Sequence, residues 1–145
     1  MLKDYKKHCE ERKEQGIPPL PLSAQQTSDL VELLKSEHAE SELLLELLKE
    51  RIPAGVDQAA YVKAAFLADI AKGKVATPII DKALATKLLG TMLGGYNIQP
   101  LISLLNDEDV GDIAVEALSN TLLIFELRSI NQIRLFTSLN MVSPL

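Results

Sequence analysis

The sequence predicts an all-α protein of six or seven helices joined by short loops. Apolar residues recur at spacings of three and four along most of the 145 residues, and no segment shows the convincing alternation of a strand. Only 4% of the residues are aromatic and none is Trp, so small aliphatic side chains must fill the core. Such side chains suit closely packed helices, and a chain of this length is expected to form one core.

The N-terminal segments predict a surface helix followed by an extended strap. Residues 2–15 are densely charged, and Tyr5 and Cys9 lie on a sparse apolar stripe, where Cys9 is interpreted as a structural thiol. The three prolines within residues 17–22 push their predecessors toward extended geometry. We therefore expect a stiff strap over the core, with a ligand for an aromatic groove as the alternative.

Three further helices are expected between residues 23 and 72. Ser23 is positioned to cap a helix that runs to about Lys35, and a leucine-rich helix follows that Pro53 stops. Asp57 is positioned to cap a helix over residues 58–72, whose many alanines let neighbouring helices approach closely. We expect this helix to be central, with its large side chains in the core: Tyr61, Phe66, Leu67 and Ile70.

Residues 88–102 form an apolar stretch that predicts a helix, an abrupt turn and another helix. Its paired glycines can take positive φ and close the first helix, while Pro100 suits the first turn of the second, which Asn97 is placed to cap. One interpretation is an ordinary corner between packed helices. The other is an exposed ridge of Tyr96 and Asn97 that meets another surface. The candidate interaction residues are Gly94, Gly95, Tyr96, Asn97, Gln99 and Pro100.

The remaining helices lie on either side of this turn. Asp81 is positioned to cap a helix over residues 82–92, and a short helix follows the turn. The acidic residues 107–109 favour the N-terminus of a last helix over about residues 110–125, because anionic groups stabilise the helix dipole there. Consecutive helices of this length fit either a bundle or a short stack of helical hairpins.

Composition and motifs exclude several classes of function. The net charge of −5 opposes a surface that binds nucleic-acid phosphates. Cys9 is the single cysteine, which excludes an internal disulfide and a four-thiolate metal site, and no apolar run is long enough for a bilayer or a secretory signal. Phosphate-loop, dinucleotide, zinc-protease and nucleophile-elbow patterns are absent. We therefore expect a cytoplasmic protein with no catalytic, metal or cofactor residue and no membrane partner.

Three blocks of the sequence carry a family resemblance: residues 1–8 with 16–18, residues 53–67, and residues 89–102. In this order and spacing they resemble the amino-terminal domain of bacterial aconitate hydratase B, across about residues 1–126. The resemblance implies a HEAT-like stack of antiparallel helices. In the family, this domain precedes a swivelling domain and an iron–sulfur catalytic core in a much longer chain.

The resemblance also implies a role. In the family a [4Fe-4S] cluster, held by cysteines of the catalytic region, interconverts citrate and isocitrate in the tricarboxylic acid cycle, and Cys9 matches none of those ligands. The implied function is a non-catalytic protein-interaction domain that helps dimerisation and shapes access to the active site. Its expected partners are a second copy or the aconitase catalytic domains, and messenger RNA enters only through the full-length family. A self-standing helical adaptor or regulator is the alternative.

The last nineteen residues, 127–145, depart from the family pattern. They contain Arg128 and Arg134 and no acidic residue, in a chain whose net charge is −5. We therefore divide the sequence into a HEAT-like domain over residues 1–126 and a divergent tail over residues 127–145, whose apolar spacing allows one extra helix. Our hypothesis for the tail is a truncated or frame-shifted gene product, or an unrelated ending.

Overall fold

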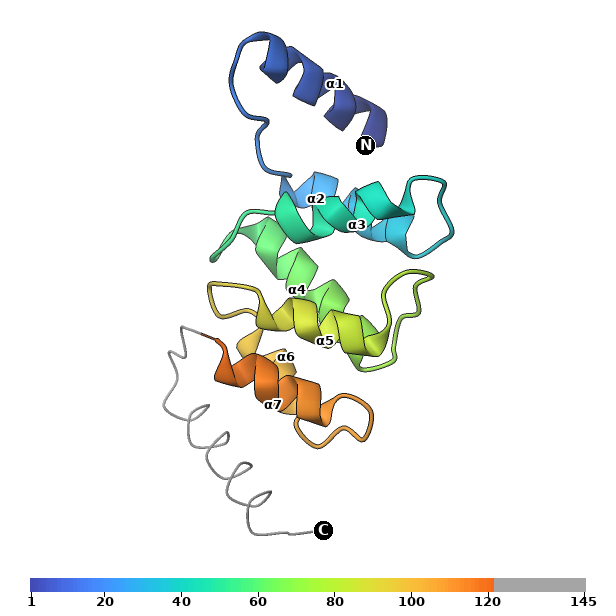
Figure 1. The fold of residues 1–145 in the computed structure, drawn as a ribbon, viewed down its shortest axis with the longest axis vertical. Helices are drawn as coiled ribbons and strands as arrows, with labels where there is room; N and C mark the ends of the chain where they lie inside the picture. The colour runs from blue at the N-terminus through green and yellow to red at the C-terminus, as the bar shows by residue number, and fades with distance from the viewer. Residues whose placement is uncertain (122–145) are drawn as a thin grey trace.

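The computed structural model describes residues 1–121, and this part of the chain contains seven helices and no strand (Figure 1). The all-α prediction is confirmed. The helices are α1 (Leu2–Glu14), α2 (Ala24–Leu34), α3 (Ser41–Glu50), α4 (Gln58–Ala71), α5 (Lys82–Gly90), α6 (Ile98–Ser103) and α7 (Gly111–Ser119).

Successive helices pack in pairs, and the pairs follow one another along the molecule. Within the pairs, α2 contacts α3, α4 contacts α5, and α6 contacts α7. Between the pairs, α2 contacts α4, and α5 contacts α7. Figure 1 shows these pairs arranged down the long axis, with α1 at the N-terminal end. Of the two architectures that the sequence allows, the chain therefore adopts the stack.

Three predicted capping residues begin their helices as expected. Ser23, Asp57 and Asp81 each accept a hydrogen bond from a backbone N–H in the first turn of α2, α4 and α5, at 3.1, 2.8 and 2.7 Å. In α2, Gln26 completes a reciprocal pair, because its side chain accepts a hydrogen bond from the backbone N–H of Ser23 at 2.9 Å. These caps set where each helix starts and hence the lengths of the loops between the helices.

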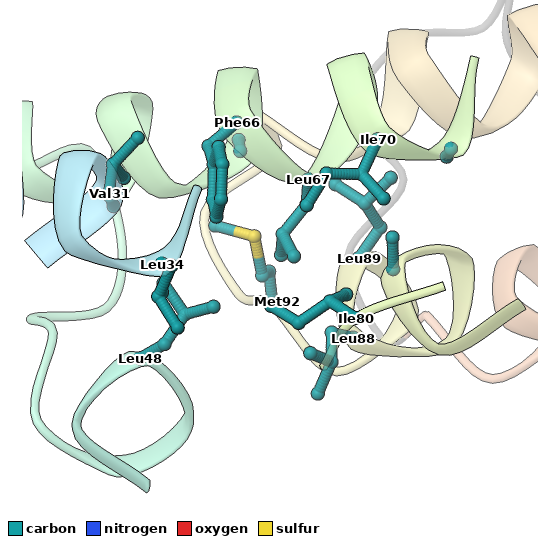
Figure 2. Close-up of a cluster of buried hydrophobic side chains, with 14 of the residues drawn as sticks. Val31, Leu34, Leu48, Phe66, Leu67, Ile70, Ile80, Leu88, Leu89 and Met92 are labelled. Carbon is teal, nitrogen blue, oxygen red and sulfur yellow. The ribbon is translucent and has the colours of Figure 1, made fainter. Parts of the chain in front are cut away.

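Helix α4 is central, as predicted, because it contacts α2, α5 and α6. Phe66 and Leu67 are buried in the core, and Figure 2 shows the Met92 side chain extended toward Phe66. The expectation that Tyr61 fills the core is wrong, since 52% of its surface is exposed. Tyr61 shares the outward face of α4 with Ala65, four residues further along, which is also exposed.

Helix α1 and the following segment are fastened to the stack by Arg51. Its Nε donates to the hydroxyl of Tyr5 at 3.0 Å, and its Nη2 donates to the carbonyl oxygen of Pro19 at 2.7 Å. Residues 17–22 contain no helix, and Leu22 is buried in the core. This segment lies as the expected strap, while Cys9 is half-buried against the core.

The last described helix is shorter than predicted. Helix α7 ends at Ser119 and Asn120 follows as its C-terminal cap, so the predicted continuation through residues 120 and 121 is wrong. Asparagine has a low helix propensity and suits such an end. The rest of the predicted helix, and the whole tail over residues 127–145, lie outside the described residues.

Candidate interaction site at the junction of two loops

The loop between α5 and α6 contains the paired glycines. Gly94 and Gly95 have φ values of +99° and +95°, which confirms the predicted positive φ. They do not close the helix, however: α5 ends at Gly90 with Thr91 as its cap, and the glycines lie beyond it in the loop. Positive φ at these two glycines lets the loop approach another backbone closely.

That second backbone is the loop between α3 and α4, and three contacts join the two loops. The backbone N–H of Gly55 donates to the carbonyl oxygen of Leu93 at 3.3 Å. The hydroxyl of Tyr96 donates to the carbonyl oxygen of Val56 at 3.1 Å. The rings of Tyr96 and Tyr61 meet edge to face, with centroids 5.4 Å apart and an interplanar angle of 78°. Segments about forty residues apart in sequence thereby form one junction.

Asn97 corrects the prediction of an exposed ridge. Its exposed fraction is 0%, and its side chain makes no cap on α6. Its Nδ2 instead donates to the carbonyl oxygens of Leu89 at 2.6 Å and Met92 at 3.2 Å. The last carbonyls of a helix lack partners within that helix, so a buried amide donor beside the end of α5 satisfies groups that water cannot reach. Asn97 is therefore an internal brace of the loop.

The other predicted interaction residues divide between the junction and α6. Gly94, Gly95 and Tyr96 lie in the junction and are half-buried. Gln99 is exposed on α6, and Pro100 lies half-buried in the first turn of that helix, as predicted. The structure thus brings three of the six residues together at the contact between the loops.

A patch of exposed apolar side chains surrounds this contact. We define the junction patch as Val56, Tyr61 and Leu93, which are 78%, 52% and 49% exposed, together with the half-buried Tyr96. Tyr96 contacts Val56 and Tyr61, and Leu93 accepts a hydrogen bond from Gly55, the neighbour of Val56 in sequence. Clustered exposed apolar side chains mark interaction surfaces more often than scattered ones do. Three of these residues, Val56, Tyr61 and Leu93, could not be recognised as a patch from sequence, because their exposure depends on how the loops pack.

A pocket of about 460 Å³ adjoins the junction patch and shares Leu93 with it. Lys63 of α4 lines this pocket although only 7% of the residue is exposed. Burial lowers the pKa of Lys63, because it disfavours the charged ammonium, and the negative charge of Glu50 partly opposes that shift. Sequence reasoning missed Lys63, since one lysine within an alanine-rich helix gives no sign of being buried.

Within residues 1–121, no cluster of three or more His, Cys, Asp or Glu side chains is arranged to hold a metal ion. In the same part of the chain, no helix combines the length and the apolar character required to span a bilayer.

The stacked pairs of helices, with a patch and a pocket where two loops meet, define an all-α domain of the helical-stack class. Residues 4–138 match the family described as the aconitate B N-terminal domain. Two relatives named aconitate hydratase B, from Pseudomonas aeruginosa and Escherichia coli, are 55% and 56% identical to this chain over 127 residues. The relative from Helicobacter pylori is 47% identical over 126 residues. The chain belongs to the aconitate B N-terminal domain family.

The similarity covers most of this chain but a small part of its relatives. The aligned segment is 87% of this chain and 15% of the length of the Pseudomonas aeruginosa and Escherichia coli proteins. The iron–sulfur cluster implied by the family does not fit the residues present, because cysteine thiolates hold such clusters and Cys9 is the one cysteine of the sequence.

Proposed function

We propose that this chain is the non-catalytic protein-interaction domain of an aconitate hydratase, and that the junction patch docks against the remainder of that enzyme. The observation that carries the proposal is the patch itself. Val56 and Leu93 expose large apolar surfaces, and the hydrogen bonds between the two loops fix the backbone at both positions. A rigid apolar surface loses little conformational freedom when it is covered by a partner.

The lengths of the aligned proteins suggest that the rest of the enzyme covers the junction patch. The matched segment is 15% of each aconitate hydratase B, so those proteins carry a long polypeptide beyond it. Other exposed apolar side chains of the described chain, Ile17 and Leu20, lie on the strap, outside the two loops that form the junction. The junction patch therefore has both the apolar character and the internal rigidity that favour docking within one enzyme.

Docking at this junction would account for two roles that the family resemblance suggests, one in dimerisation and one in access to the active site. A surface that fixes this domain against the catalytic region would help dimerisation and shape access to the active site. The interconversion of citrate and isocitrate, and the [4Fe-4S] cluster that performs it, belong in this proposal to the rest of the enzyme. The chain itself is proposed to act in the cytoplasm and to carry out no reaction.

The test is binding of the 145-residue chain to an aconitate hydratase B from which the N-terminal domain has been removed. We expect a saturable complex by sedimentation velocity and titration calorimetry. Leu93→Asp is expected to weaken it by about tenfold or more, because a carboxylate then has to be desolvated at the interface. Leu20→Asp is the matched control, since Leu20 is similarly exposed but lies on the strap.

Two outcomes would overturn the proposal: absence of binding, or equal weakening by Leu93→Asp and Leu20→Asp. Val56→Asp provides an independent variant, because Val56 is the most exposed residue of the patch and its substitution leaves the core untouched. A chain that binds no part of the enzyme would support the self-standing adaptor instead.

A further inference from the structure

The pocket beside the junction patch is formed by three parts of the stack. Its walls come from the end of α3 and the loop after it, from α4, and from the end of α5 with the loop after that. Its volume of about 460 Å³ lies in the range of small-ligand sites, which is roughly 300–1,000 Å³. The apolar lining residues are Ile52, Pro53, Ala54, Leu88, Met92 and Leu93.

Lys63 is the charged group buried most deeply in this lining. Nine-tenths of the residue is buried, yet within residues 1–121 no hydrogen bond or ion pair reaches its ammonium. An ammonium has three donors, and partial removal from water disfavours its charged form, while Glu50 of the same lining attracts it without a hydrogen bond. The Nζ atom of Lys63 stays open to the pocket, so an accepting group bound there can reach it.

The remaining charges of the pocket restrict the partner. Lys49 and Glu50 are the other ionisable residues of the lining, and both are exposed at its edge. Together with Lys63 they give the pocket one net positive charge. A single carboxylate balances that charge. Glu50 would repel a group with several negative charges, and Lys63 would repel a cation. The apolar walls suit a hydrocarbon or aromatic body behind the carboxylate.

We propose that this pocket binds one carboxylate group carried on an apolar body, with Nζ of Lys63 donating hydrogen bonds to the carboxylate oxygens. The carboxylate is supplied either by a free organic acid or by an acidic side chain or terminus of a docked polypeptide, since both present the same chemistry. The proposal rests on the pocket and on Lys63, and it stands independently of docking at the junction patch.

The experiment titrates the 145-residue chain with 4-phenylbutyrate and follows the side-chain signals of Lys63 and Met92 by NMR. The alcohol and the amine of the same carbon skeleton are the matched probes. We expect saturable binding of the carboxylate, about tenfold or more tighter than that of the alcohol, because a charge-assisted hydrogen bond is lost in the alcohol. We also expect the pKa of Lys63 to rise on binding, since a nearby carboxylate favours the charged ammonium.

Two variants complete the test. Lys63→Met keeps the apolar length of the side chain and is expected to abolish the preference for the carboxylate over the alcohol. Lys74→Met, an exposed lysine outside the pocket lining, is the control and is expected to retain that preference. Equal affinities of the unmodified chain for carboxylate and alcohol would overturn the proposal, and so would an undiminished preference in Lys63→Met.

A competition arm distinguishes the two sources of the carboxylate. The chain, saturated with 4-phenylbutyrate, is titrated with the aconitate hydratase B that lacks its N-terminal domain. Displacement of the probe, together with weaker binding of the truncated enzyme to Lys63→Met than to the unmodified chain, identifies a carboxylate of the docked polypeptide. Simultaneous binding of both identifies a free organic acid as the ligand.

Discussion

A Cβ atom placed on Gly94 would lie 2.3 Å from the carbonyl oxygen of Gly55. The loop between α5 and α6 therefore rests directly on the loop between α3 and α4, with no room for a side chain between them. Both glycines have positive φ, +99° at Gly94 and +89° at Gly55. The contact between these two loops is thus a contact between two glycine backbones, and the junction patch is built around it.

Gly94→Ala is expected to destabilise the chain far more than Gly55→Ala. At Gly94 the new Cβ adds overpacking of roughly 1–3 kcal/mol to a left-handed strain of roughly 1–2 kcal/mol. At Gly55 no atom lies within 4 Å of the added Cβ, so only the strain is incurred. Gly95→Ala should likewise cost more than about 1 kcal/mol, because its φ is +95°. Urea unfolding measures all three, and equal losses for Gly94→Ala and Gly55→Ala would contradict the close approach.

Asn97→Asp tests the internal brace. The substitution replaces the two N–H donors to Leu89 and Met92 with an acceptor, so at neutral pH it should lower the free energy of unfolding by about 3 kcal/mol or more. Burial and the neighbouring carbonyl oxygens should raise the pKa of the introduced carboxyl above its unfolded value of about 3.9.

The pH dependence of that variant follows from its raised pKa. The folded state then binds more protons than the unfolded state, so the variant's stability relative to the unmodified chain falls as pH rises above about 4. Paired urea unfolding at pH 4 and pH 7 measures the difference. A deficit that stays constant over this range would show that the introduced carboxyl is solvated, and hence that Asn97 is not buried.

The helices were predictable from sequence because their signals are local, whereas the choice of a stack over a bundle was implied by the family resemblance. The residue types of Ser23, Asp57 and Asp81 mark them as N-terminal caps of helices. The spacing of the apolar residues predicts which face of each helix is buried. The junction patch was not predictable, because it arises where two loops far apart in the sequence meet. Asn97 shows the same limit, since residue type suggested a cap and only the path of the loop turns its side chain inward.

Lys63 shows why a helix pattern can mislead. Helix α4 is apolar on almost all sides, so its contacts with α2, α5 and α6 bury a position that would face solvent on a simple amphipathic helix. A charge at such a position disfavours the folded state, and the proposed carboxylate binding would give Lys63 a role that offsets this cost.

Lys63→Met is therefore expected to stabilise the chain by about 1 kcal/mol or more at neutral pH, because it removes a charge that burial disfavours and that makes no hydrogen bond within residues 1–121. The pKa of Lys63 is lower in the folded state than its ordinary value of 10.5, so the unfolded state binds more protons in the window below that value. Stability of the unmodified chain should then rise with pH through this window relative to Lys63→Met. Thermal unfolding at pH 7 and pH 10 measures the difference in stability between the unmodified chain and Lys63→Met. A variant less stable than the unmodified chain at pH 7 would contradict the burial of a charged Lys63.

Arg51→Ala should release the strap while leaving the stack folded. Arg51 joins Tyr5 of α1 to Pro19 of the strap, and these hydrogen bonds contribute about 1–3 kcal/mol together. Limited proteolysis should therefore cut within residues 16–22 much faster in this variant, with little change in helix content by circular dichroism. Arg12→Ala, which loses one hydrogen bond to Pro18, is the milder comparison. Unchanged cleavage in Arg51→Ala would show that other contacts hold the strap.

Docking through the junction patch can be measured by hydrogen exchange of the chain with and without an aconitate hydratase B that lacks its N-terminal domain. We expect slower exchange at the backbone amides of residues 54–56 and 93–96 in the mixture, with the strap, residues 17–22, unchanged. Protection confined to the strap, or identical exchange in both samples, would contradict it.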